Sequence, residues 1–150
     1  MNALSQYSRR SLLASIATAS LLLAGCATLG LGGGAVRLSG DKEVPAVQTA
    51  GSGSGTITMA KDGSVSGSVT TKGVPGVAAH IHFGAAGKNG PVIIPLTKSG
   101  DSTWVVPAGA KLTDAHMSAY KAGDLYVNVH TAAHKGGEVR GQIKAWALLD

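Results

Sequence analysis

Short runs of alternating apolar and polar residues recur along most of the chain, and glycine-containing turns separate them. Residues 55–60 and 125–131 are clear examples. Because side chains two apart share one face of a strand, each run has the pattern of a half-buried β-strand. The pairs Asp62-Gly63 and Asn89-Gly90 favour tight turns between such strands. The spacing predicts an all-β domain, an antiparallel Greek-key sandwich or barrel of about eight strands.

One segment departs from this pattern and predicts a short helix over residues 113–122. Thr113 is a good N-terminal cap, Asp114 suits the positive end of the helix dipole, and Gly123 follows the last turn. We expect this to be the one helix of the domain.

The first 25 residues have the composition of a bacterial lipoprotein signal peptide. Arg9 and Arg10 precede an apolar stretch over 11–23, which leads into Leu-Ala-Gly before Cys26. We expect Cys26 to be lipidated, residues 26–35 to be the lipidated N-terminus and a glycine-rich linker, and 36–150 to form the domain. The two arginines leave Sec and twin-arginine export open.

This leader predicts a location on the periplasmic side of the cell envelope, anchored in the membrane by lipid. Ala27 follows the cysteine where an aspartate would favour the inner membrane, so the outer membrane is favoured. The formal net charge is +5, but the lysines are scattered singly, so we expect no nucleic-acid partner.

The sequence from Ala79 to Gly84 places two histidines two residues apart in a predicted strand. His80 and His82 would share one face, while Ile81 and Phe83 would share the other and face the core. The two imidazoles would then lie on the opposite surface, close enough to bind one ligand together.

A third histidine, His130, alternates with Asn128 and Tyr126 on the polar face of a later predicted strand. If the two strands are neighbours, three imidazoles could bind a metal ion, with copper our first choice and zinc the second. His134, in the following turn, is a candidate fourth ligand. The alternative is that these histidines only hydrogen-bond to loop carbonyls.

Three further polar residues are candidates to support such a site. Glu138 and Arg140 share a strand face, so Glu138 could accept a histidine N–H and Arg140 could attract an anion. A structural ion pair or hydrogen-bond network is the other interpretation. For Asn128 we favour a hydrogen bond to a loop carbonyl.

Several blocks, in order and spacing, resemble the CHRD domain, a module named after chordin. They read LSG and EVP near residues 38–45, AHIH and GKNGPV over 79–92, and LYVNVHT and GGEVRGQ over 125–142. The resemblance covers roughly residues 36–146 and implies a secreted β domain, like the repeats of chordin and the single domains of bacterial members. The chain has His134-Lys135 where the family usually has Asn-Pro.

The sequence leaves three functions open. The first is a lipid-anchored CHRD protein of the envelope that binds a metal ion through surface histidines. The second is a non-catalytic protein-interaction module of the envelope, with an unknown partner. The third rests on a weaker likeness to copper–zinc superoxide dismutase over residues 55–84, but the zinc-loop ligands and disulfide cysteines of that enzyme have no counterpart. We therefore favour a function without catalysis.

Overall fold

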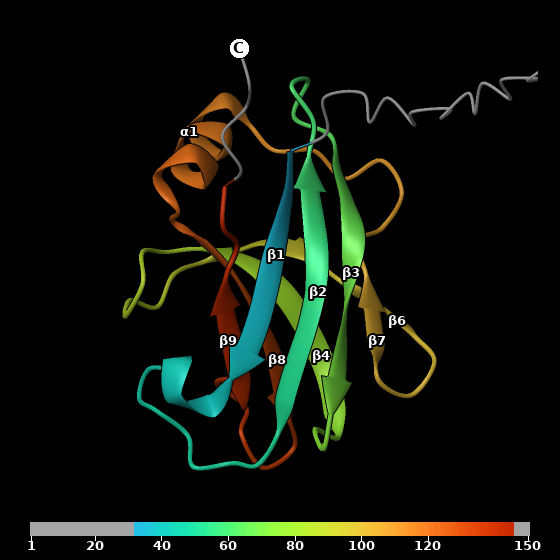
Figure 1. Cartoon of the computed structure of the whole chain (residues 1–150), viewed down its shortest axis with the longest axis vertical. Coiled ribbons are helices and arrows are strands. Elements are labelled where there is room, and N and C mark those ends of the chain that lie inside the picture. Colours follow the sequence, from blue (N-terminus) through green and yellow to red (C-terminus); the bar gives the residue numbers. More distant parts are fainter. Residues whose placement is uncertain (1–31, 146–150) are drawn as a thin grey trace, which may run out of the picture.

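The computed structural model of the chain describes residues 32–145, so the predicted leader, Cys26 and Trp146 lie outside the described part. Within it, nine strands and one α-helix occur (Figure 1). In chain order they are β1 (Gly32–Ser39), β2 (Ser52–Met59), β3 (Val65–Lys72), β4 (Gly76–Phe83), β5 (Val92–Pro95), β6 (Thr97–Ser99), β7 (Thr103–Val105), α1 (Asp114–Ala122), β8 (Leu125–Thr131) and β9 (Val139–Gln142), with a 3-10 turn η1 (Gly40–Lys42) after β1.

All nine strands belong to one antiparallel sheet in the order β5-β4-β8-β9-β1-β2-β3-β7-β6. The two edge strands, β5 and β6, are consecutive in the chain. Between them, the N–H of Leu96 donates to Ala79 O of β4 at 2.9 Å. The sheet therefore curls into a nearly closed barrel, and the predicted all-β antiparallel fold is confirmed.

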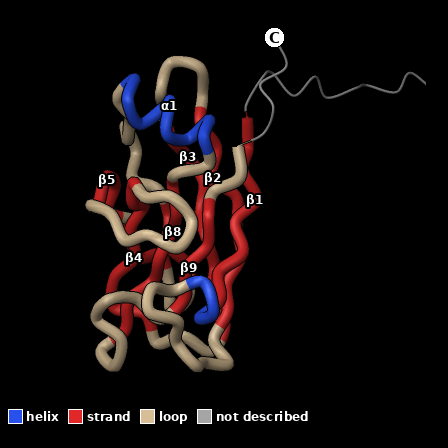
Figure 2. The backbone as a smooth tube through the Cα atoms, turned by 90° about the vertical axis from the view of Figure 1, so that its left-hand side faces the viewer, coloured by secondary structure: helices blue, strands red, loops and turns tan. Residues whose placement is uncertain are grey.

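The core fills the space between the two sides of the curled sheet. The inward residues of the alternating runs are buried there, as expected: Ile57 and Met59 of β2 and Val127 and Val129 of β8 are each 0% exposed. Because apolar residues fill the interior of the barrel, the polar side chains that could form a site lie on its outward face. The views in Figures 1 and 2 place α1 at one end of the barrel and η1 at the other.

The prediction that Phe83 faces the core is wrong. Ile81 is fully buried, but Phe83 is 41% exposed. Phe83 is the last residue of β4, and its ring lies 5.9 Å from that of His116 on α1. Alternation holds along the strand, but at its end the core no longer covers the inward position.

One strand boundary and the number of strands also differ from those expected. β1 begins at Gly32, so residues 32–35, expected to be linker, pair with β2 from Met59 to Thr56. β6 is a strand of three exposed residues that no alternation marks, which brings the number of strands to nine in the described chain.

The predicted helix is confirmed as α1. The Thr113 side chain accepts a hydrogen bond from the His116 N–H, and Gly123 ends the helix with a φ of 82°. In the part of the chain that the structure describes, no helix has the length and apolar character needed to cross a membrane.

Candidate metal centre

Three histidines from two paired strands meet on the outward face of the sheet. β4 pairs with β8, with Ala78 opposite His130 and His80 opposite Asn128. His80 and His130 are therefore diagonal neighbours, and His80 Nδ1 lies 2.9 Å from His130 Nε2. One ring nitrogen of each of His80, His82 and His130 lies within 4.8 Å of the other two.

Two of these rings are oriented by backbone carbonyls. His82 Nδ1 lies 2.9 Å from Gly90 O, and His130 Nδ1 lies 2.9 Å from Lys135 O. Because a carbonyl oxygen only accepts, each Nδ1 must carry the hydrogen. In this tautomer each Nε2 can only accept: that of His82 has no partner, and that of His130 accepts the hydrogen of His80 Nδ1. An Nδ1–H tied to a carbonyl, with Nε2 as the acceptor, is the tautomer that metal-binding histidines adopt in this setting.

Two buried acceptors at the site lack a donor. His82 is 7% exposed, and its Nε2 has no hydrogen-bond partner; nor does Asn128 Oδ1. Asn128 cannot be turned around, because its Nδ2 donates to Glu43 Oε1 and to Gly136 O, both at 3.1 Å. A group that supplies positive charge or hydrogen, a cation or a water molecule, would satisfy both atoms.

The environment disfavours the protonated forms of His80 and His82. Burial lowers the pKa of His80, and the neighbouring His130 and His82 lower it further. Burial also lowers the pKa of His82, although its contacts with Gly90 O and the Asn128 side chain act in the opposite direction. Neutral imidazole is the form that binds metal, so both shifts favour a metal ion over a proton.

A buried ion pair lies beside the histidines and holds the surrounding loops. Arg140 Nε lies 3.1 Å from Glu43 Oε2, and both side chains are 3% exposed. The same guanidinium donates to Lys88 O and Asn89 Oδ1, so it fastens the loop of residues 84–91 over this face. Burial raises the pKa of Glu43, while Arg140 lowers it.

An aromatic ring connects this ion pair to the histidines. The Tyr126 ring is stacked on that of His82, with centroids 4.8 Å apart and planes at 7°. The guanidinium carbon of Arg140 lies 4.0 Å from the centroid of the same Tyr126 ring. His82 is thus enclosed by the stacked Tyr126 ring and by the loop of residues 84–91. It does not lie on the open surface that the strand pattern predicted.

The remaining predicted site residues lie around this cluster in different ways. His134 is not part of the three-histidine group; its backbone shapes the turn after β8. Glu138 accepts a hydrogen bond from Thr49 Oγ1 at 2.8 Å, not from a histidine. Arg140 is buried against Glu43 and does not face solvent.

Two important residues were not identified from the sequence. Glu43 lies far from the histidines in the chain, in a segment without strand alternation; the EVP block of the CHRD resemblance includes it but does not indicate a role. Tyr126 could have been found, because it alternates with Asn128 and His130 on one face of the same strand.

Comparison with known proteins places this architecture in a family. The model of the CHRD domain matches residues 35–143, from within β1 to just past the end of β9. No curated protein and no solved structure matches the chain. All three clustered histidines and the Arg140–Glu43 pair fall within the matched residues. The chain belongs to the CHRD domain family.

Proposed function

We propose that this protein binds one transition-metal ion through His80, His82 and His130. The observation that carries the proposal is the orientation of the imidazoles: two Nδ1–H groups are tied to carbonyls, so Nε2 is the ligand atom of both His82 and His130. The Nε2 of His82 has no partner, and that of His130 accepts the hydrogen of His80 Nδ1 at 2.9 Å. His80 would bind through Nδ1 after its hydrogen moves to Nε2.

The three nitrogens need only a small adjustment to bind an ion. Metal–nitrogen bonds of about 2.0–2.1 Å in a tetrahedral site place ligand nitrogens about 3.3 Å apart. The closest pair is at 2.9 Å and all three fall within 4.8 Å, so side-chain rotation is sufficient. Asn128 Oδ1, buried and without a donor, is available to an ion or to a water bound to it.

Copper is our first choice of metal and zinc the second. Imidazole nitrogens suit both ions, and a three-histidine set leaves an open position. Affinity at a given nitrogen site is normally higher for Cu²⁺ than for Zn²⁺. An oxidising compartment outside the cytoplasm, which the leader predicts, would maintain copper in its divalent form.

The experiment is a competition titration of the full chain with Cu²⁺ and Zn²⁺ against a chromophoric chelator. We expect one equivalent to bind, and the double variant His80→Ala/His82→Ala to lose at least about 100-fold in affinity, as expected when two ligands are removed. His116→Ala is the matched control, because His116 lies on α1 and outside the cluster. Unchanged affinity in the double variant would refute the proposal.

We also propose that the domain works from the periplasmic side of the envelope, anchored by lipid on Cys26. The Leu-Ala-Gly sequence before Cys26 supports this, and only five residues separate Cys26 from Gly32, where β1 begins. Mass spectrometry of the N-terminal peptide should find an acylated cysteine. An unmodified Cys26 preceded by an uncleaved leader would contradict the assignment.

A further inference from the structure

A cavity of about 500 Å³ lies on the other side of the loop that covers His82. Its floor is formed by β1 and β9, which are adjacent in the sheet. Ala86 and Gly87 of the loop form one wall, and Lys42 of η1 contributes to another. Neither the histidines nor the Arg140–Glu43 pair lines this cavity, so it is separate from the candidate metal centre.

The cavity is lined by three cations and no carboxylate: Arg37, Lys42 and Lys144. Lys42 is neutralised by Asp41 at 2.7 Å. The exposed side chains of Arg37 and Lys144 make no ion pair with any carboxylate among residues 32–145. Within residues 32–145, the positive charges of Arg37 and Lys144 are therefore uncompensated, above a floor that includes Ala35 and Gly141.

The walls of the cavity are fixed by contacts that do not involve these cations. Gln142 Nε2 donates to Gly84 O at 3.1 Å and to Gly123 O at 2.8 Å, which holds the loop against β9. A Cβ on Gly141 would lie 2.1 Å from Arg37 O, so glycine is needed for the close approach of β9 to β1. Arg140 holds the outer part of the loop. Because these walls are already fixed, the protein loses little conformational entropy when a ligand binds.

We propose that this cavity binds a phosphate monoester with a small organic body. A phosphate monoester carries about −1.5 to −2 charges at neutral pH, which matches the two free cations. The planar guanidinium of Arg37 can donate two parallel hydrogen bonds to phosphate oxygens, and Lys144 supplies a point charge. The volume exceeds that of a phosphate ion alone, so it leaves room for the esterified group over the apolar floor.

Two sources share this chemistry, a soluble phosphate ester and the headgroup of a lipid such as phosphatidic acid. The short chain between Cys26 and β1 would hold the cavity near a membrane surface if Cys26 is lipidated. The proposal itself does not depend on the metal site or on the lipid.

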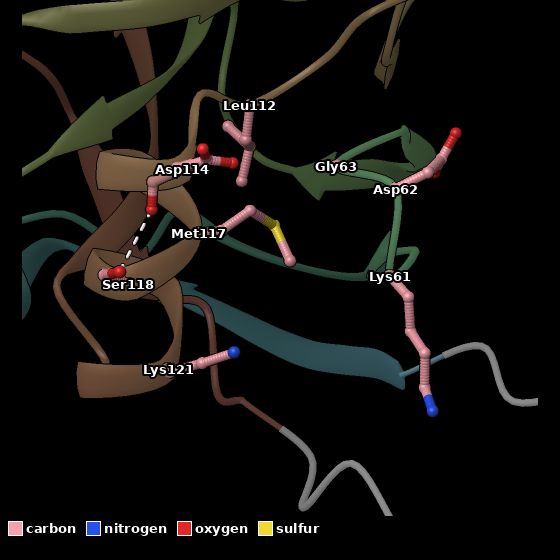
Figure 3. A pocket seen from close by; sticks show the side chains of 8 residues that line it. All are labelled: Lys61, Asp62, Gly63, Leu112, Asp114, Met117, Ser118 and Lys121. Atoms are coloured by element: carbon pink, nitrogen blue, oxygen red, sulfur yellow. Dashed lines mark hydrogen bonds between the residues drawn. The ribbon is translucent and has the colours of Figure 1, made fainter.

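A second cavity provides a matched control. It has a volume of about 350 Å³ and lies between α1 and the β2–β3 turn, where Lys61 and Lys121 accompany Asp62 and Asp114 (Figure 3). Its lysines and carboxylates balance, unlike the cations of the first cavity. Replacing Lys61 and Lys121 changes the net charge of the protein as much as replacing Arg37 and Lys144.

The test is calorimetric titration of the full chain, held in an uncharged and phosphate-free detergent, with glycerol phosphate and with dihexanoyl phosphatidic acid. Saturable binding of either probe should weaken at least about 10-fold in Arg37→Gln/Lys144→Gln, as expected for the loss of charge-assisted contacts. It should stay within twofold of wild type in Lys61→Gln/Lys121→Gln. All four substituted side chains extend to the surface, so both variants should keep the wild-type thermal transition.

The two probes separate the possible sources. Binding of glycerol phosphate supports the proposal with a soluble ligand, and binding of phosphatidic acid alone supports it with a lipid headgroup. If neither probe saturates, or if both double variants lose affinity equally, the cavity is not a phosphate site and the proposal is wrong.

Discussion

At the scale of single residues, His82 differs most from its surroundings. It is 7% exposed, stacked on Tyr126, tied to Gly90 O through Nδ1 and without a partner at Nε2. A buried imidazole with one free lone pair is costly unless something satisfies that lone pair. A metal ion at His82 Nε2 would satisfy this lone pair, so His82 affects both metal binding and the stability of the metal-free domain.

We predict that His82 makes the metal-free domain less stable in mild acid. Its pKa is lowered in the folded protein by burial, so the unfolded chain binds more protons as the pH falls below about 6.5. The contribution of neutral His82 to the free energy of unfolding should be fully present above that pH. It should be lost as the pH falls toward the pKa of His82 in the folded protein. Urea unfolding with a metal chelator present, at about pH 7.5 and about pH 5.5, should show a smaller loss in His82→Gln than in wild type.

Two controls accompany this measurement. Glu43 titrates in both proteins, so the comparison between them removes its contribution. His116→Gln should behave like wild type, because His116 lies on α1, outside the three-histidine cluster. An equal loss of stability in wild type and His82→Gln on acidification would contradict the prediction.

At the scale of elements, the loop of residues 84–91 is fastened to the sheet instead of lying free over it. Arg140 of β9 donates to Lys88 O and to Asn89, and Asn89 Nδ2 in turn donates to Val44 O at 2.9 Å. The Arg140–Glu43 pair thus joins β9, the segment after η1 and the loop. The loop of residues 84–91 covers the candidate metal centre and also forms one wall of the proposed phosphate cavity. Both features therefore depend on the Arg140 side chain.

Removing one charge of this pair should be strongly destabilising. Glu43→Gln leaves the buried guanidinium without a counter-ion, and we expect a loss of about 3 kcal/mol in the free energy of unfolding. The double variant Glu43→Gln/Arg140→Met removes both charges and should lose less than the sum of the two single variants. Urea denaturation measures each value, and additive losses would show that the pair is not coupled.

At the scale of the whole molecule, the barrel closes at one residue. Leu96 lies between the edge strands β5 and β6, is 8% exposed, and donates its N–H to Ala79 O of β4. The chain thereby passes directly from one edge strand to the other, and the two edges of the sheet come together at this residue.

Leu96→Ala should test how much packing supports this closure. Truncation leaves a cavity at the joint, so we expect the free energy of unfolding to fall by about 2–3 kcal/mol in thermal or urea denaturation. Val77→Ala is the control, because Val77 is 63% exposed and its loss should cost less than about 0.5 kcal/mol. Equal effects of the two substitutions would show that closure does not depend on Leu96.

The sequence predicts what depends on local periodicity and misses what depends on distant contacts. Alternation places His80 and His82 on one face because the period of two is a property of the strand itself. The pairing of β4 with β8, which adds His130, joins segments about 50 residues apart and could only be stated as a condition.

The same distinction explains the errors around the site. The loop that buries His82 and the acid that pairs with Arg140 come from segments without any regular pattern. Phe83 was misplaced because alternation does not show where a core ends. Helix α1 was predicted with its caps because Thr113 and Gly123 act within one turn of the helix they bound.

The position of β1 has a mechanical consequence. β1 is the central strand of the sheet, with β2 on one side and β9 on the other. If a lipid holds the chain at Cys26, a pulling force on the tether reaches the middle strand before any other element. The force would have to break the pairing with β2 along all of β1 and also the pairing with β9 at Ser39 and Arg140, so the domain would resist extraction better than if its first strand lay at an edge.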